Sequence, residues 1–142
     1  MRICVISSTV FPVHPPAGTS GYSGLEVLAW QIAKGLAARG HEVALIAPDG
    51  SSCPGVQMIH TGPAGQHSEE QAYGGAKGKD AAVKEFLYKQ GYWQHLTWAE
   101  CVVDHSWAKW SLMLKREGVL KAPVLCVCHA PINTMLSSLP PG

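Results

Sequence analysis

The chain has 142 residues, of which 46% are hydrophobic and 15% charged, so it is predicted to fold around one buried core rather than to be disordered. A formal net charge of +1 without a basic block argues against a nucleic-acid-binding surface, which needs clustered Lys and Arg. No apolar run approaches the roughly 20 residues that span a bilayer, and the N-terminus lacks a signal-peptide pattern, so we expect a cytoplasmic protein.

The first strand, loop and helix are the most informative part of the sequence. Residues 3–7 form an apolar run that predicts a buried strand, and the loop after them ends in Gly21-Tyr22-Ser23-Gly24. Ser23 is a predicted N-cap, and Gly40 follows the helix as a C′ glycine would. Residues 43–47 predict a second strand. The helix between them carries apolar residues at i, i+3, i+4 and i+7, namely Leu25, Leu28, Ala29, Ile32, Ala33, Leu36 and Ala37.

The middle of the chain predicts mostly loop. Residues 48–78 contain many Gly and Pro turn signals, with one short strand expected over 56–59. Residues 60–79 are too long for a passive connector in a compact domain, which predicts a functional loop or a partly disordered one. A helix capped by Asp80 is expected to reach about residue 89, and a further helical turn or two over 92–99.

The last third returns to alternating strands and helices. Residues 101–103 predict a short buried strand, followed by Asp104-His105-Ser106-Trp107 and a helix that ends at Gly118. Residues 124–128 predict the last strand, which leads into His129-Ala130-Pro131. The predicted helix places Trp107, Trp110, Ser111 and Leu114 on one face.

This alternation predicts an α/β fold, a Rossmann-like and mostly parallel sheet with helices on both faces. Ligands bind such sheets at the carboxyl ends of the strands. The polar segments 9–24, 104–107 and 129–134 follow three strands, so we expect them to face one side of the domain.

The glycine loop before Leu25 has two interpretations. Backbone N–H groups of the Gly21-Tyr22-Ser23-Gly24 loop could approach a diphosphate at the helix N-terminus, or the loop could be a plain strand–helix turn. It is not a G-x-G-x-x-G loop, and Asp49 is only a weak candidate for a ribose contact, which disfavours a nicotinamide or flavin enzyme.

Two histidines follow predicted strands. His129 would point into the cleft and bond a sugar hydroxyl or a developing charge, or it would be a structural histidine bonded to a backbone carbonyl. Asp104 could orient the imidazole of His105, although pairing of these neighbours needs a turn; the alternative is a helix-capping role for Asp104. The tryptophans are predicted to pack in the core more than to stack on sugars, namely Trp93, Trp98, Trp107 and Trp110.

The cysteines are odd in number, and we predict that they are reduced. Cys126-x-Cys128-His129 is spaced too closely for a zinc site and has no second ligand pair, so no metal is predicted. No cofactor is expected either. The full set is Cys4, Cys53, Cys101, Cys126 and Cys128.

Several of these pieces together resemble family 4 glycosyltransferases of the GT-B fold. Ser23-Gly24-Leu25-Glu26 is similar to their Gly-Gly-x-Glu loop, and residues 36–43 to the helix end Leu-x-x-Arg-Gly-His-Glu-Val. Residues 102–107 are similar to their Val-Val-His-Asp-His-Ser strand end, and residues 124–131 to their Val-x-Thr-x-His strand. Residues 50–78 match poorly, and Ser23 replaces the first glycine of the family's pair.

The resemblance implies transfer of a hexose from a nucleotide sugar, such as UDP- or GDP-hexose, to an acceptor with retention and without a required metal. It implies that His129 is the catalytic cleft histidine and that Gly24 and Ser23 lie near the donor diphosphate. Gly21, Tyr22 and His105 would line the acceptor side.

The resemblance also implies a domain organisation. Residues 1–142 would be a single, truncated N-terminal domain, the incomplete half of a GT-B fold. The donor-binding C-terminal domain would come in cis or from a second chain in trans, and the fragment alone would be inactive. A non-catalytic binding or assembly module and a nucleotide-binding oxidoreductase domain stay open as alternatives.

Overall fold

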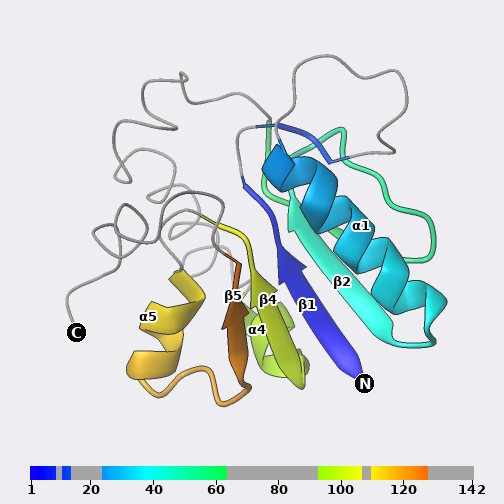
Figure 1. Ribbon diagram of the computed structural model, residues 1–142. Helices are drawn as coiled ribbons and strands as arrows, with labels where there is room; N and C mark the ends of the chain where they lie inside the picture. Colours follow the sequence, from blue (N-terminus) through cyan, green and yellow to red (C-terminus); the bar gives the residue numbers. More distant parts are fainter. Residues whose placement is uncertain (9–10, 14–23, 64–92, 107–109, 128–142) are drawn as a thin grey trace.

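The computed structural model describes residues 1–8, 11–13, 24–63, 93–106 and 110–127 (Figure 1). In these ranges the elements follow in the order β1 (Arg2–Ile6), α1 (Gly24–Ala38), β2 (Glu42–Ala47), β3 (Gln57–His60), α4 (Trp93–Trp98), β4 (Cys101–Asp104), α5 (Trp110–Arg116) and β5 (Val124–Cys126).

The described strands form one five-stranded sheet in the order β3-β2-β1-β4-β5, and every neighbouring pair is parallel. The predicted Rossmann-like α/β fold is therefore confirmed. The chain builds outward from β1 in one direction through β2 and β3, and then crosses to the other side of β1 to add β4 and β5. The order thus reverses between β1 and β4.

Helices cover both faces of the sheet, as the sequence predicts. Figure 1 shows α1 on one face and α4 on the opposite face. Alternate side chains of β1 divide between the two layers: Val5 packs with Ala29 and Ala33 of α1, whereas Ile6 packs with Leu96 of α4. Because both faces are covered, the central strands are almost continuously apolar.

Helix α1 differs in detail from the predicted apolar stripe. Leu28 is 36% exposed, whereas Glu26 is only 2% exposed. The buried stripe is centred on Leu25, Ala29 and Ala33, so Leu28 falls at its edge. Glu26 lies at the other border of the stripe, where the structure gives its carboxyl group a hydrogen-bond partner.

The end of α1 follows the prediction for Gly40. This glycine has a φ of 91°, a left-handed conformation that favours glycine. The Gly40 amide donates to Ala37 O at 3.0 Å, and the His41 amide donates to Leu36 O at 3.3 Å. These two bonds define a Schellman motif, which satisfies carbonyls at the helix end and turns the chain into β2.

The last elements agree with the prediction in type and differ in length. β5 ends at Cys126, two residues earlier than predicted, although the Val127 amide still donates to Asp104 O at 3.0 Å. Gly118 has a φ of 77° and follows α5 as expected. The predicted helix over 81–89 lies outside the described residues.

The core position of Cys4 leads to a testable result. Burial raises the pKa of the Cys4 thiol far above its ordinary value, and the nearby Asp104 carboxylate raises it further. We expect Cys4 to resist alkylation in the native protein, because the reactive thiolate is disfavoured there. Cys101 and Cys126 are only partly buried and should react first. Mass spectrometry of maleimide-treated peptides checks this, and rapid native labelling of Cys4 would contradict the packing.

Candidate functional site

The candidate site lies at the carboxyl ends of β1 and β4. Helix α1 begins on one face of the sheet after β1, and α5 packs through Leu114 on the other face after β4. The two strand ends are adjacent, since the His105 amide donates to Ile6 O at 2.9 Å. In open α/β sheets, ligands bind where the connections from neighbouring strands diverge to opposite faces.

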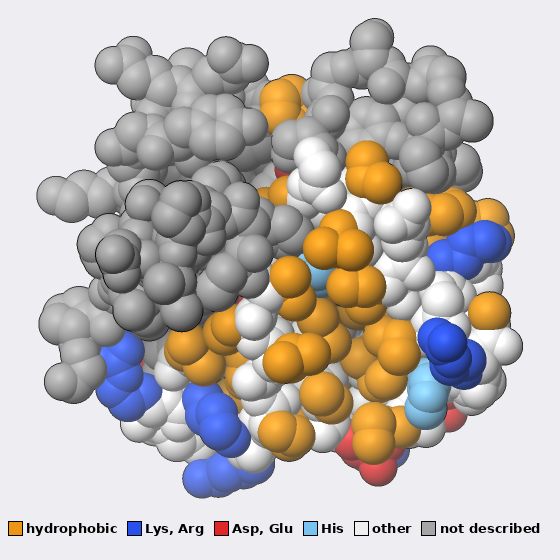
Figure 2. Space-filling view, in the orientation of Figure 1, with side chains coloured by type: hydrophobic (Ala, Val, Ile, Leu, Met, Phe, Trp, Pro, Cys, Tyr) orange, Lys and Arg blue, Asp and Glu red, His pale blue; other side chains and the backbone are white. Residues whose placement is uncertain are grey.

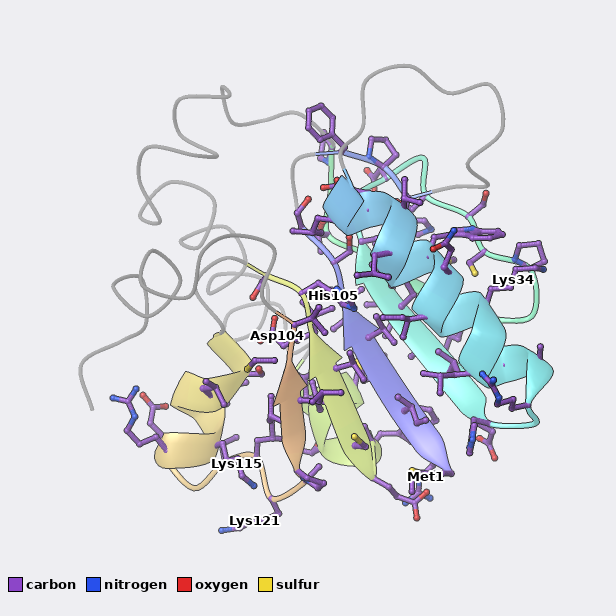
Figure 3. The ribbon with its side chains drawn as sticks, in the orientation of Figure 1. Met1, Lys34, Asp104, His105, Lys115 and Lys121 are labelled. Atoms are coloured by element: carbon purple, nitrogen blue, oxygen red, sulfur yellow. The ribbon has the colours of Figure 1, made fainter. Side chains whose placement is uncertain are left out.

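Buried polar side chains gather at this edge. Acidic side chains are almost never fully buried unless they are paired, yet Glu26 and Asp104 are 2% and 0% exposed. Figure 3 shows Asp104 and His105 at the same end of β4. The buried polar residues of β1, α1, β4 and their loops are Ser7, Ser8, Glu26, Asp104, His105, Ser106 and Ser111.

Asp104 connects the end of β4 with the first turn of α5. One carboxylate oxygen, Oδ1, accepts from the Ser106 amide at 2.8 Å and from Ser106 Oγ at 2.5 Å. The other oxygen, Oδ2, accepts from the Ser111 amide at 3.3 Å and from Ser111 Oγ. Since Ser111 lies in the first turn of α5, these bonds give Asp104 the helix-capping role that the sequence left open.

Glu26 ties the first turn of α1 to the chain that leaves β1. Ser8 Oγ donates to Glu26 Oε1 at 2.5 Å, and both residues are buried. An acidic side chain in the first helical turn is also favoured by the helix dipole. The bond therefore fixes the direction in which the chain leaves the sheet toward the glycine loop.

Ser7, which directly follows β1, lies at the same edge but differs from Ser8 in its hydrogen bonding. Its Oγ is buried, and within the described part of the chain the atom has no hydrogen-bond partner. A buried hydroxyl without a partner costs free energy, so it indicates a place where a ligand or a water can bind. The Ser7 amide, in contrast, donates to Ile46 O at 2.9 Å and continues the sheet.

Two of the predicted site residues can be placed. Gly24 begins α1, is exposed, and has open space where a Cβ would lie, with no atom within 4 Å. His105 follows β4 and is 0% exposed, so it lies beneath the edge rather than on the surface. The structure thus brings Gly24 and His105 to the same end of the sheet. The other predicted site residues, Gly21, Tyr22, Ser23 and His129, lie outside the described residues.

The remaining sequence predictions concern metals and aromatic residues. Among the described residues, no three His, Cys, Asp or Glu side chains are grouped in a way that could hold a metal ion. Trp98, the last residue of α4, packs against the core, and the centre of its ring lies 6.0 Å from the Arg2 guanidinium, which agrees with its predicted packing role. In the part of the chain that is described, no helix combines the length and the apolar character needed to cross a membrane.

The sequence prediction missed the buried partners at this edge. Ser8, Glu26 and Ser111 had no assigned role, although all three make the hydrogen bonds that shape it. One signal could have revealed Glu26, because Ser23-x-x-Glu26 has the spacing of a capping box. No local pattern could have revealed Ser111, since its bond to Asp104 spans seven positions across a loop.

Comparison with known proteins adds little to this geometry. No family model matches the sequence, and no curated protein matches it. Among solved structures, the C-terminal domain of the Coenzyme A biosynthesis bifunctional protein CoaBC is similar with a TM-score of 0.43 and 14% identity. The match covers 75% of this chain and 45% of that chain. So distant a likeness carries no argument about fold or function, and the α/β architecture follows from the parallel sheet itself.

Proposed function

We propose that this chain is the N-terminal, acceptor-side part of a retaining glycosyltransferase that transfers a hexose from a nucleotide sugar. The observation that carries the proposal is the meeting of the resembling segments at one edge of the sheet. Gly24 begins α1 there, the His105 amide bonds to Ile6 O, and Val127, two positions before His129, bonds to Asp104 O. Segments far apart in the sequence thus converge where an α/β sheet binds its ligands.

The chemistry of this edge suits a hydroxyl-rich ligand. Ser7 Oγ offers one hydrogen-bonding atom without a partner in the described residues. The exposed backbone at Gly24 leaves room for a phosphate to approach the start of α1. In the proposed reaction His129 contacts the donor sugar near the reacting centre, and His105, which is buried, supports the acceptor side from beneath the edge. The residues that hold the donor base would come from a second domain.

Two glycine-to-alanine variants test whether a phosphate group binds at Gly24, at the start of α1. Gly24→Ala should weaken binding of UDP-, GDP- or ADP-hexoses roughly tenfold, because the added methyl group occupies the space that the diphosphate needs. It should leave the free energy of unfolding unchanged or raise it by about 0.4–1 kcal/mol, since no protein atom lies within 4 Å of that methyl group. Calorimetric titration and urea unfolding measure the two effects.

The control is Gly35→Ala, a second α1 glycine whose Cβ would meet only Arg39 at 3.8 Å. This variant should bind each nucleotide sugar as the wild type does. Equal affinity of both variants and the wild type would remove Gly24 from the donor site. In a complete two-domain enzyme, absence of transfer or hydrolysis with all three donor classes would contradict the proposal itself.

A nucleotide-binding oxidoreductase domain is the second candidate, and Asp49 is the residue on which it would depend. Asp49 is exposed two positions after β2, the strand next to β1, and its amide donates to Gly62 O at 2.8 Å. An acidic side chain at this strand end can bind the ribose hydroxyls of a dinucleotide. Titration with NADH and NADPH separates the candidates: binding that is lost in Asp49→Ala supports the dinucleotide, and no binding excludes it.

A further inference from the structure

On the side of the sheet that carries α1, the central strands β2, β1 and β4 present apolar side chains up to their carboxyl ends. Leu45, Val5 and Val103 are register partners in one row, and all three belong to the core beside α1. Figure 2, which views the face that carries α1, shows hydrophobic side chains gathered in the middle of it. A polar side chain buried in this layer is therefore an exception, and it needs a partner.

The next row, at the carboxyl ends of the strands, contains two such exceptions, Ser7 and His105. The sheet continues into this row, since both amides donate to carbonyl groups of a neighbouring strand at 2.9 Å. Ser7 and His105 come two positions after Val5 and Val103, so the alternation of side chains places them on the same α1 side. Ala47 of β2 follows Leu45 in the same way and packs in the core beside α1.

The first turn of α1 lies next to this row. Ala29 packs in the same core as Val5, and α1 begins five positions before Ala29, at the carboxyl edge of the sheet (Figure 1). Ser7 therefore stands between the start of α1 and His105. In the proposed transferase the diphosphate binds at the start of α1 and His105 supports the acceptor side, so the transferred hexose lies between them.

The Ser7 hydroxyl has the chemistry to bind a hydroxyl group of that hexose. Ser7 is 1% exposed, and its Oγ has no hydrogen-bond partner within the described part of the chain. His105 already has an interaction of its own, so only its position enters the argument. A serine hydroxyl both donates and accepts hydrogen bonds. A sugar hydroxyl can satisfy both functions, whereas a phosphate oxygen accepts only.

We infer that Ser7 is a specificity-determining residue whose Oγ forms a hydrogen bond with a hydroxyl group of the transferred hexose. The inference rests on the proposed function and assigns the sugar, rather than the diphosphate, to the middle of the edge. Because Ser7 is buried, the hexose reaches Oγ only when the atoms that cover it move aside. The new bond then removes the free-energy cost of a buried hydroxyl without a partner.

Calorimetric titration of Ser7→Ala tests the inference, with UDP-, GDP- and ADP-glucose and with the corresponding nucleoside diphosphates as probes. The variant should bind the sugar nucleotide roughly tenfold more weakly than the wild type, the factor expected for one hydrogen bond. Its affinity for the nucleoside diphosphate should not change. Its midpoint of urea unfolding should be equal or higher, since alanine removes a buried hydroxyl that has no partner in the described residues.

Ser51→Ala is the matched control for the unfolding measurement. Ser51 is also buried and also follows a strand of the sheet, but its Oγ accepts a hydrogen bond from the Val13 amide at 2.8 Å. Loss of this bonded hydroxyl should lower the urea midpoint. The two serines are thus expected to differ in the sign of their effect on stability.

Each contrary outcome overturns the inference for a different reason. Equal sugar-nucleotide affinity of Ser7→Ala and the wild type would remove Ser7 from the site and leave the proposed function standing. An equal loss of affinity for the nucleoside diphosphate would place Ser7 at the diphosphate instead. A urea midpoint as low as that of Ser51→Ala would show that Ser7 has a structural partner. A wild type that binds none of the three sugar nucleotides would contradict the proposed function and this inference together.

Discussion

Asp104→Ala is expected to lower the free energy of unfolding by about 3–5 kcal/mol. The carboxylate is 0% exposed and accepts hydrogen bonds from the amides and hydroxyls of Ser106 and Ser111. Alanine removes the common acceptor and leaves buried amide and hydroxyl groups without it. Since small domains are stable by about 5–15 kcal/mol, the loss is a large part of the total. Urea unfolding followed by circular dichroism measures it.

Two further variants make this prediction specific. Asp104→Asn keeps one acceptor oxygen at nearly the same shape, so its cost should be about 1–2 kcal/mol. Asp49→Ala is the matched control, because Asp49 also follows a strand of the sheet but is exposed. Its effect should stay within about 0.5 kcal/mol. If Asp104→Ala were as mild as Asp49→Ala, the buried serine contacts would not contribute to folding.

Glu26→Ala should be the second most damaging substitution, at about 2–4 kcal/mol. Glu26 is 2% exposed, and its Oε1 is the acceptor that Ser8 Oγ uses at 2.5 Å. Alanine removes that acceptor and leaves a cavity under the first turn of α1. Glu26→Gln keeps the size and one acceptor oxygen, and should cost about 1 kcal/mol.

The control for Glu26 is Glu42→Ala at the start of β2. Glu42 is exposed, so its substitution should change the free energy of unfolding by less than about 0.5 kcal/mol. Amide exchange of the first turn of α1 adds a local readout, since loss of the tie to Ser8 should accelerate it before the core opens. Equal unfolding curves for Glu26→Ala and Glu42→Ala would show that the buried pair is not a structural tie.

The local features of the fold could be predicted because local patterns encode them. Apolar runs in the sequence predicted β1 and β2, and Gly40 predicted the end of α1. The structure explains the second prediction, because Gly40 has a left-handed φ of 91° that favours glycine. The alternation of strands and helices predicted parallel pairing. Strand order could not be derived in the same way, because the adjacency of β1 and β4 depends on contacts between distant residues.

The candidate site was only partly predictable for the same reason. Strand ends identified the edge at which His105 and Gly24 lie. Helical periodicity predicted Leu28 as buried and assigned no role to Glu26, yet the structure reverses their exposure. The reversal depends on Ser8, which is 18 positions away from Glu26 and belongs to another element. Side chains that hold a site in shape are thus less visible in a sequence than the loops that carry it.

The place of β1 between β2 and β4 has a consequence for how the protein is made. The Arg2 amide bonds to the Glu100 carboxylate across 98 positions, so β1 lacks one of its two neighbours until β4 has been synthesised. At about 5–20 residues per second, a ribosome needs roughly 5–20 s to cover that distance. During this delay a strongly apolar strand has one unpaired edge, which exposes the nascent chain to aggregation and to capture by chaperones.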